Sequence, residues 1–202
     1  NTPIWFRDSS ADADGYHAYR AGAVTVMVDP QINVGEQKTG TAGADTFVSG
    51  TGDDTITGGG GDDVLDLTKA ADSSGEITVS SDLIVDLAAG KSLDASGVLG
   101  SDTLVGIQNV STGQGDDSVT GSAAANIITT DLGSDSVGSN DTVDGGGGGD
   151  SINTGAGDDV ITFYADSSID GGDGEDTLRL SGNPIELNQA APEVTNIEVL
   201  DI

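Results

Sequence analysis

The sequence contains no cysteine, so neither disulfide bonds nor thiolate metal sites can stabilise a fold, and catalysis by a thiol is excluded. Basic residues are also scarce: the 202 residues include 6 lysines and arginines against 35 aspartates and glutamates, which gives a formal charge of −29. Such a charge raises the free energy of a compact state unless cations neutralise it. We therefore expect bound cations, and we expect neither nucleic acid nor an anionic membrane surface as a partner.

Two further absences bear on the class of protein. Aromatic residues make up only 3% of the chain, and acidic chains with few aromatic residues are often disordered. No apolar run approaches the roughly 18 residues that a membrane-spanning helix needs. Membrane insertion is therefore not expected, and any ordered structure must be explained by something other than a large aromatic core.

Glycine, by contrast, is abundant, with 32 residues, and it recurs together with aspartate at a period of nine. Three units run in tandem: GTAGADTFV (40–48), SGTGDDTIT (49–57) and GGGGDDVLD (58–66). Their sixth-place aspartates are Asp45, Asp54 and Asp63, and one large apolar residue follows each aspartate by two places. The pattern predicts a repeat architecture with one inward-facing apolar side chain per unit.

A second group of units follows later in the chain. It consists of TGQGDDSVT (112–120), the degenerate GSAAANIIT (121–129), TDLGSDSVG (130–138), the shortened SNDTVD (139–144), GGGGGDSIN (145–153), TGAGDDVIT (154–162) and GGDGEDTLR (171–179). The sixth-place aspartates are Asp117, Asp135, Asp150, Asp159 and Asp176. Tandem recurrence in register is far more specific than a single match would be in a glycine-rich chain.

Each unit is expected to combine a turn with a short strand. Glycines at the first, second and fourth places should supply positive φ angles and let neighbouring backbones approach closely. The turn carbonyls would point inward as hard oxygen ligands, and the sixth-place aspartate adds a carboxylate, which is the ligand set that calcium favours. Because each unit reverses the chain, two units complete one coil, turn n stacks on turn n+2, and calcium ions lie between stacked turns. Residues 40–45 should thus pair with residues 58–63.

Several calcium ions are predicted, held by oxygens of these turns. The predicted ligand residues are Gly40, Ala42, Asp45, Gly50, Gly52, Asp54, Gly58, Gly60, Asp63, Gly113, Gly115, Asp117, Asp135, Gly145, Gly147, Asp150, Gly155, Gly157, Asp159, Gly171, Asp173 and Asp176. One large apolar residue in nine offsets little of the backbone entropy, which is about 1 kcal/mol or more per residue. The repeats are therefore expected to be disordered without metal.

The units resemble the glycine-rich nonapeptides of repeats-in-toxin (RTX) proteins, G-G-x-G-x-D-x-U-x with U a large apolar residue. Residues 58–66, 145–153 and 171–179 match every fixed position. The resemblance implies an all-β fold, an elongated parallel β-roll or β-helix solenoid with calcium in the glycine-rich turns. It also implies export from a Gram-negative cell in an unfolded state, followed by folding outside.

Five segments are expected within one structural unit. They are an N-terminal cap (1–38), a first RTX block (39–66), a strand-rich spacer stacked on the roll (67–111), a second RTX block (112–179) and C-terminal closing strands (180–202). Alternating apolar residues at 77–87 indicate the spacer strands. Within the spacer, Asp102 occupies a sixth place, as a peripheral ligand or as a solvated side chain. For residues 1–38 the alternative is a ligand or partner surface built from Trp5, Tyr16 and Tyr19.

An enzyme is not expected. His17 is the only histidine, and no nucleophile with a base or zinc-type spacing accompanies it. The paired acids, such as Asp53 and Asp54, recur in register, which a catalytic pair of a glycosidase would not do.

The flanks 77–90 and 100–126 resemble strand-rich segments that precede RTX blocks in large bacterial surface adhesins, and 194–202 resembles the closing segment of such blocks. We therefore expect a calcium-binding structural module of a secreted bacterial cell-surface protein: an adhesin, or a subunit of a surface layer or filament. The alternative is the calcium-folding and secretion module of a type I-secreted enzyme or toxin. A carbohydrate- or ice-binding face is a third possibility, which the irregular outward positions disfavour. Besides calcium, the expected partners are further copies of the chain or neighbouring domains of a larger surface protein.

Overall fold

The computed structural model describes residues 6–11, 17–21, 24–28, 35–72, 75–131, 138–164, 167–181 and 193–202. Every strand or helix assigned in these ranges is a β-strand. No helix in the described part of the chain has the length and apolar character needed to cross a membrane. The chain divides into two compact units, Asn1–Val34 and Gly35–Ile202, where the sequence predicted one unit with an N-terminal segment that ends at Lys38.

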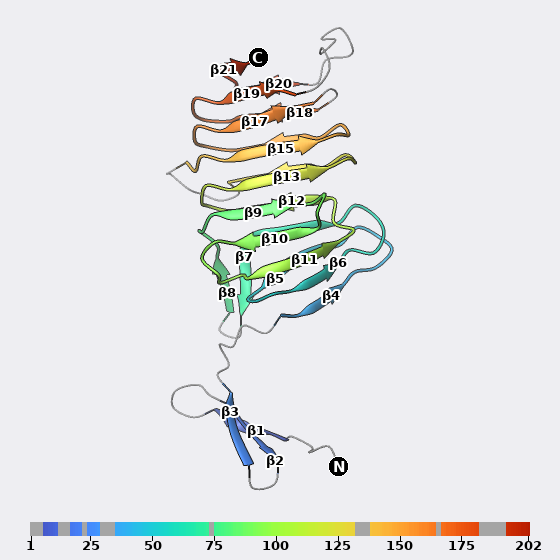
Figure 1. Cartoon of the computed structure of the whole chain (residues 1–202), viewed down its shortest axis with the longest axis vertical. Helices are drawn as coiled ribbons and strands as arrows, with labels where there is room; N and C mark the ends of the chain where they lie inside the picture. The colour runs from blue at the N-terminus through green and yellow to red at the C-terminus, as the bar shows by residue number, and fades with distance from the viewer. Residues whose placement is uncertain are drawn as a thin grey trace. The chain divides into compact units, whose positions relative to one another are not determined.

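The first unit contains a three-stranded antiparallel sheet (Figure 1). Its strands are β1 (Phe6–Ala11), β2 (His17–Ala21) and β3 (Val24–Val28), in the order β1-β2-β3. That this segment caps the roll stays a prediction. Of the alternative aromatic surface, Trp5 and Tyr16 lie outside the described residues, and Tyr19 lies on β2.

The second unit is built from many short strands. They are β4 (Gln37–Thr39), β5 (Thr46–Gly50), β6 (Thr55–Thr57), β7 (Val64–Asp72), β8 (Gly75–Thr78), β9 (Leu83–Asp86), β10 (Lys91–Asp94), β11 (Ser101–Val105), β12 (Asn109–Ser111), β13 (Ser118–Ser122), β14 (Ile127–Thr129), β15 (Thr142–Gly146), β16 (Ser151–Asn153), β17 (Val160–Phe163), β18 (Ser168–Asp170), β19 (Thr177–Leu180), β20 (Val194–Thr195) and β21 (Val199–Asp201). Most of these strands are short, as expected for a repeat unit with six residues in a turn and three in a strand.

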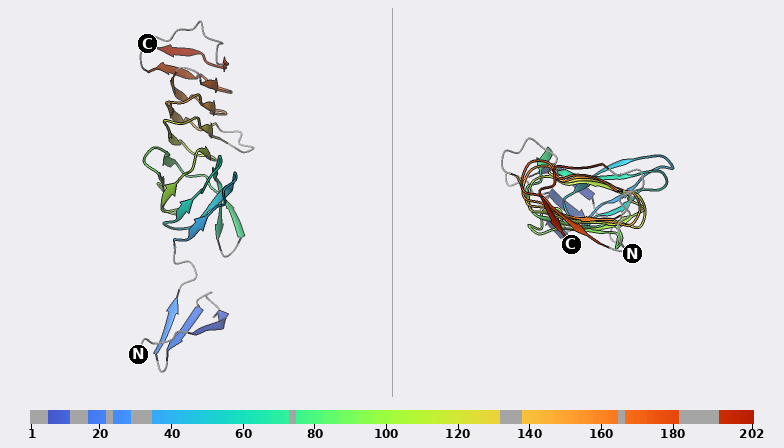
Figure 2. Two further views of the ribbon diagram at one scale, coloured as in Figure 1. Left: turned by 90° about the vertical axis from the view of Figure 1, so that its right-hand side faces the viewer. Right: turned by 90° about the horizontal axis from the view of Figure 1, so that it is seen from above.

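These strands form two sheets in which each repeat strand pairs with the strand two places along the chain. One sheet has the order β21-β19-β17-β15-β13-β9-β10-β11-β6-β4, and the other has the order β20-β18-β16-β14-β12-β7-β5, with β8 beside β7. The pairing between repeat strands is parallel, as between β4 and β6 or between β5 and β7. Successive coils therefore lie over one another (Figure 2). The predicted parallel β-roll is confirmed.

The spacer departs from the parallel rule in two strands, and the first is β8, which is antiparallel to β7. The second is β10, which is antiparallel to both of its neighbours, β9 and β11, whereas β11 is parallel to β6 and β9 is parallel to β13. The cause is a short turn at Leu87–Gly90, with Gly90 at a φ of 67°, which returns the chain to the sheet that it has just left. A six-residue turn would carry it to the opposite sheet.

Two ladders of aliphatic side chains fill the space between the sheets. One ladder comprises Phe47, Leu65, Val110, Ile128, Ile152 and Ile169, which are paired in register across adjacent strands. The other comprises Ile56, Leu104, Val85, Val119, Val143, Ile161 and Leu178. All of these side chains are at most 8% exposed. Further buried apolar residues widen the core beside the ladders: Leu67, Val79, Leu83, Leu87, Leu99, Ile107 and Phe163.

Replacement of one ladder residue should show how much its burial contributes to the free energy of unfolding. Ile128 is fully buried, whereas its neighbour Ile127 on β14 is 56% exposed. We expect Ile128→Ala to lower the free energy of unfolding by about 2–5 kcal/mol and Ile127→Ala to change it by no more than about 0.5 kcal/mol. Urea unfolding in saturating calcium provides the measurement, and equal losses for the two variants would contradict the inward ladder.

Candidate metal-binding turns

The turns that connect the sheets require glycine for two separate reasons. In the turn 58–63, the second and fourth places, Gly59 and Gly61, have φ angles of 106° and 98°, which residues with a side chain rarely adopt. Gly58, at the first place, does not have a positive φ. The sequence-based expectation of positive φ at the first place is therefore wrong, and another constraint acts there.

That constraint is the space beside the sixth-place carboxylate. A Cβ atom on Gly58 would collide with Oδ2 of Asp63 and with the carbonyl oxygen of Gly106 in the next coil. At Gly171 it would collide in the same way with Oδ2 of Asp176 and the carbonyl oxygen of Asn196. One carboxylate oxygen and one carbonyl oxygen thus converge on the position that a side chain would fill. The missing side chain leaves a small cradle lined by hard oxygen atoms.

The sixth-place residues form two rows along the roll, one on each side. The acidic row has two hydrogen-bonded stretches, Glu36–Asp54–Asp102 and Asp117–Asp141–Asp159–Asp176–Glu198, and the mixed row has two, Asp45–Asp63–Gln108 and Asn126–Asp150–Ser167. At the start of the second acidic stretch, the Leu83 N–H donates to Asp117 Oδ1 at 2.8 Å. Within a row, a side-chain oxygen accepts a hydrogen bond from the backbone N–H of the equivalent residue one coil earlier. The Asp117 N–H donates to Asp141 Oδ1 at 2.8 Å, for example, and the Asp141 N–H donates to Asp159 Oδ1 at 2.7 Å.

The second carboxylate oxygen, Oδ2, lacks a hydrogen-bond partner in several of these residues. In five of these aspartates Oδ2 is buried and receives no hydrogen bond: Asp63, Asp117, Asp141, Asp159 and Asp176. The five residues are at most 2% exposed. Buried polar atoms in folded proteins almost always have a partner, and an unpaired buried carboxylate is especially costly. A cation beside each Oδ2 would remove this cost.

The chemistry of the available donors fits calcium. Among the described residues, no three histidine, cysteine, aspartate or glutamate side chains converge on one point. A bound ion would therefore take one or two carboxylate oxygens and complete its shell with backbone carbonyls and water. Calcium accepts six to eight such oxygen ligands in flexible geometry. The turns thus fit calcium better than zinc, which prefers nitrogen and sulfur ligands.

Burial also changes the acidity of these carboxyl groups in the metal-free protein. It raises the pKa of Asp117 and of Asp141 to about 7, and that of Asp159 to about 6. Neighbouring carboxylates add to the rise, as Asp117 does for Asp141. Protons therefore compensate for an absent cation near neutral pH.

Not all of the predicted ligand residues have a free oxygen. Oδ2 of Asp45 accepts hydrogen bonds from the backbone N–H and the hydroxyl of Thr41, at 2.6 and 2.9 Å. Oδ2 of Asp54 accepts one from the Gly50 N–H at 2.9 Å, and Oδ2 of Asp150 lies 3.5 Å from the Ser167 hydroxyl.

The predicted turn partners are brought together as expected. Gly60 N–H donates to the Thr41 carbonyl at 3.0 Å, and Asp173 pairs with the turn 154–159 through Gly155 and Gly157. Asp135 lies outside the described residues. The assignment of individual ligands stays a prediction.

Two aspartates of the acidic row, and the glutamates at its ends, were not among the predicted ligands. Asp141 lies between Asp117 and Asp159 in the row, and its distance of 18 residues from Asp159, two repeat periods, was a usable signal in the sequence. Asp102 was considered a peripheral ligand or a solvated side chain. It is 3% exposed and accepts a hydrogen bond from the Asp54 N–H, so it is a buried member of the row.

The fifth-place side chains form a separate, exposed ladder. Asp116 N–H donates to Asp82 Oδ1, Asn140 N–H to Asp116 Oδ1, and Asp158 N–H to Asn140 Oδ1, at 2.8–3.0 Å. These bonds run in the direction opposite to those of the sixth-place rows. In adjacent acidic pairs such as Asp116 and Asp117, the first residue therefore belongs to the exposed fifth-place ladder and the second to the buried sixth-place row.

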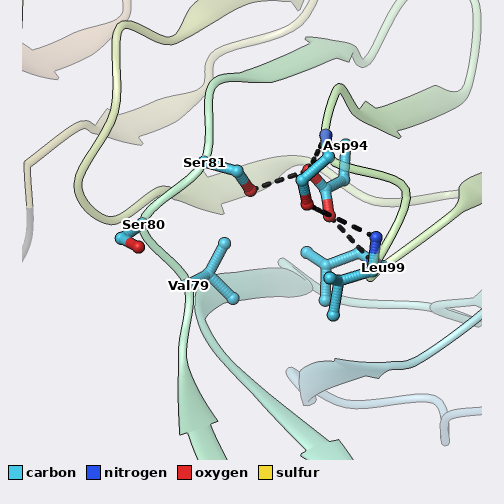
Figure 3. Close-up of a pocket in the computed structure, with 7 residues that line it drawn as sticks. Val79, Ser80, Ser81, Asp94 and Leu99 are labelled. Atoms are coloured by element: carbon cyan, nitrogen blue, oxygen red, sulfur yellow. Dashed lines mark hydrogen bonds between the residues drawn. The ribbon is translucent and has the colours of Figure 1, made fainter.

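A cavity beside the spacer differs from the turns in its chemistry (Figure 3). It has a volume of about 370 Å³ and borders Asp94. The Asp94 carboxylate accepts hydrogen bonds from Ser81 Oγ at 2.7 Å, from Leu99 N–H at 2.9 Å, and from the N–H and hydroxyl of Ser96 at 2.8 and 2.7 Å. Burial raises the pKa of Asp94, but these hydrogen bonds outweigh burial and lower it below its ordinary value. This carboxylate is therefore stabilised by the protein alone.

A comparison with known protein families adds an independent finding. The model of the RTX calcium-binding nonapeptide repeat matches the chain in four copies, at residues 39–73, 96–137, 138–167 and 164–182. These segments include all five aspartates with an unpaired Oδ2. A search of curated proteins finds no match.

The first-place cradle leads to a substitution test. Gly58→Ala should weaken calcium-induced folding, because the new Cβ would occupy the space between Asp63 Oδ2 and the Gly106 carbonyl. Gly43→Ala is the matched control, since Gly43 also lacks a positive φ and has only the Thr41 hydroxyl, at 3.9 Å, near the new atom. Calcium titration followed by circular dichroism checks this prediction. Equal calcium concentrations at the folding midpoint of the two variants would contradict a role of the cradle in calcium binding.

The raised pKa values predict how the metal-free protein responds to pH. A carboxyl group that titrates near 7 when folded, against its ordinary 3.8, binds protons more tightly in the folded state. Its contribution to stability is therefore complete below about pH 4 and is lost as the pH rises through 6 to 7. In chelator, strand content by circular dichroism should be higher at pH 5 than at pH 8. Asp141→Asn should flatten this dependence, and an increase in strand content toward pH 8 would contradict the assignment.

Proposed function

Because the chain belongs to the RTX calcium-binding nonapeptide repeat family, we propose that it is a structural module of a secreted bacterial surface protein that folds when calcium fills its turns outside the cell. The observation that carries this proposal is the set of five buried Oδ2 atoms without a hydrogen-bond partner. In the turns of Asp63 and Asp176, a backbone carbonyl of the next coil lies beside the same position as the unpaired oxygen. The number of ions and the location at a Gram-negative cell surface are part of the proposal.

The energetics support folding that depends on calcium concentration. The ladders place only two large apolar side chains in each coil, while the formal charge of −29 opposes compaction. If each site binds with a dissociation constant near ~10⁻⁴ M, as extracellular modules do, calcium at a hundredfold excess stabilises the fold by about 2.7 kcal/mol per site. At cytosolic calcium concentrations this contribution nearly vanishes. The module would thus stay unfolded until export.

A structural role accounts for the acidic pairs better than a catalytic one. Asp116 and Asp158 each accept a backbone hydrogen bond in the exposed ladder, and Asp117 and Asp159 belong to the buried row. The same arrangement recurs from coil to coil, so no single pair is distinguished by its surroundings. We therefore propose that the chain is not itself an enzyme.

The proposed setting is an adhesin, or a subunit of a surface layer or filament. Its support is the likeness of segments 77–90, 100–126 and 194–202 to the flanks of RTX blocks in large surface adhesins. The full-length protein discriminates between this setting and the alternative, a module of a type I-secreted enzyme or toxin. Giant tandem extender domains in the same protein would support the first, and a metalloprotease or hydrolase domain would support the second.

The calcium-binding role itself is tested with an adjacent pair of aspartates. Asp63→Asn keeps the oxygen that accepts from Asp45 N–H but replaces the unpaired Oδ2 with an NH₂ group, so the calcium concentration at the folding midpoint should rise several-fold. Asp62→Asn, at the exposed fifth place, should leave the midpoint unchanged. Circular dichroism during calcium titration of chelator-treated protein gives both values. Full strand content without calcium at pH 8, or full replacement by magnesium, would overturn the proposal.

A further inference from the structure

The aspartates of the acidic row differ along the roll in whether their Oδ2 atoms have a hydrogen-bond partner. On one side of the spacer, at Asp117, Asp141, Asp159 and Asp176, each Oδ2 lacks a partner. On the other side, at Asp54 and Asp102, both carboxylate oxygens have partners. Since these residues hold equivalent places in stacked turns, the difference requires a local cause.

At Asp54, Oδ2 accepts a hydrogen bond from the Gly50 N–H at 2.9 Å, and the side chain of Lys38 adds a positive charge beside the same oxygen. Its Nζ lies 3.7 Å from Asp54 Oδ2 and 3.3 Å from Glu36 Oε2, and it donates a hydrogen bond to the Val48 carbonyl at 2.6 Å. The ammonium group is therefore surrounded by two carboxylates and one backbone carbonyl. This is the same class of oxygen ligands that the other turns offer to calcium.

The strand register explains how a lysine reaches this position. Lys38 pairs with Ile56 across β4 and β6, so it occupies the inward place that an aliphatic residue holds in the following coils. The lysine side chain is only 23% exposed. Its long aliphatic stem lies where the apolar ladder would continue, and its charged end reaches the acidic row.

Serine hydroxyl groups supply further hydrogen bonds to the buried carboxylates of Asp54 and Asp102. Ser49 Oγ lies 2.9 Å from Asp102 Oδ2 and 3.3 Å from Asp54 Oδ2, and Ser92 Oγ donates to Asp102 Oδ2 at 3.0 Å. In the turn 154–159, the corresponding first-place hydroxyl of Thr154 donates instead to the Gly171 carbonyl at 2.8 Å. The Thr154 hydroxyl also lies close enough to Asp159 to lower the pKa of that carboxyl, but its hydrogen bond is to the backbone carbonyl.

We propose that the Lys38 ammonium group takes the place of a calcium ion in the first coil, so that residues 36–57 are held together by a cation that belongs to the chain. Both sixth-place aspartates of this coil, Asp45 and Asp54, have their Oδ2 atoms satisfied by the protein. The first coil therefore keeps its structure without metal, while the coils from Asp117 onward require calcium. This inference rests on the proposed calcium-dependent folding of those later coils.

Hydrogen–deuterium exchange read by mass spectrometry tests the inference segment by segment. The chain, Lys38→Met and Lys91→Met are compared in chelator and in saturating calcium. Lys91 is the matched control, because it is an exposed lysine on β10 and its replacement changes the net charge equally. In chelator, residues 36–57 should exchange at least about tenfold faster in Lys38→Met than in the unchanged chain, since a charge-assisted contact is lost, and Lys91→Met should show no change.

Calcium should then distinguish the two parts of the roll. In the unchanged chain it should protect residues 138–164 strongly and residues 36–57 little. In Lys38→Met it should restore the protection of residues 36–57, because the vacated position offers oxygen ligands. The inference is overturned if residues 36–57 depend on calcium as strongly as residues 138–164 in the unchanged chain, if Lys38→Met behaves like Lys91→Met in chelator, or if calcium fails to restore that variant. If calcium protects no segment, the calcium-dependent function fails, whereas the comparison of the two lysine variants in chelator still tests Lys38.

Discussion

Buried carboxylate oxygens without hydrogen-bond donors constrain the whole roll. In the turns at Asp63, Asp117, Asp141, Asp159 and Asp176, one oxygen of each carboxylate ties two coils together, and the other is enclosed without a partner. The residue that stacks the coils is therefore also the residue whose buried charge a cation would compensate. Folding and cation binding are coupled in the same side chain, because the coil cannot close without burying the charge.

The remaining features of the repeat follow from this coupling. The first-place glycine leaves room beside the free oxygen, and the second- and fourth-place glycines allow the backbone to turn within six residues. Both uses of glycine increase the entropy that is lost on folding. Many of the short strands are left with one inward aliphatic residue, as at Ile128 and Ile152. Apolar burial alone is thus a weak source of stability, which is why we propose that a bound cation stabilises the fold.

The chain satisfies its buried carboxylates in more than one way. Asp94 is saturated by hydroxyl and backbone donors from Ser81, Ser96 and Leu99. Asp54 lies beside the ammonium group of Lys38, and Asp102 accepts from Ser49 and Ser92. These protein-satisfied carboxylates belong to the first coil and the spacer, whereas the unpaired oxygens of the acidic row all follow the spacer. Unpaired carboxylate oxygens are therefore unevenly distributed along the acidic row, and the proposed dependence on calcium follows that distribution.

The nine-residue period determined by itself the parallel roll, the inward aliphatic ladder and the place of aspartate in each turn, because those features depend on backbone geometry that repeats locally. Tertiary structure decided the rest. The reversal at β10 arises from the short turn at Leu87–Gly90, and Asp141 holds its place in the row through bonds to neighbouring coils. A carboxylate oxygen can meet a donor of its own turn, as Asp45 meets Thr41, or a donor far along the chain, as Asp102 meets Ser49, 53 residues away. A repeat motif specifies which residue faces the turn, but the folded turn and its stacked neighbours decide whether a donor reaches each oxygen.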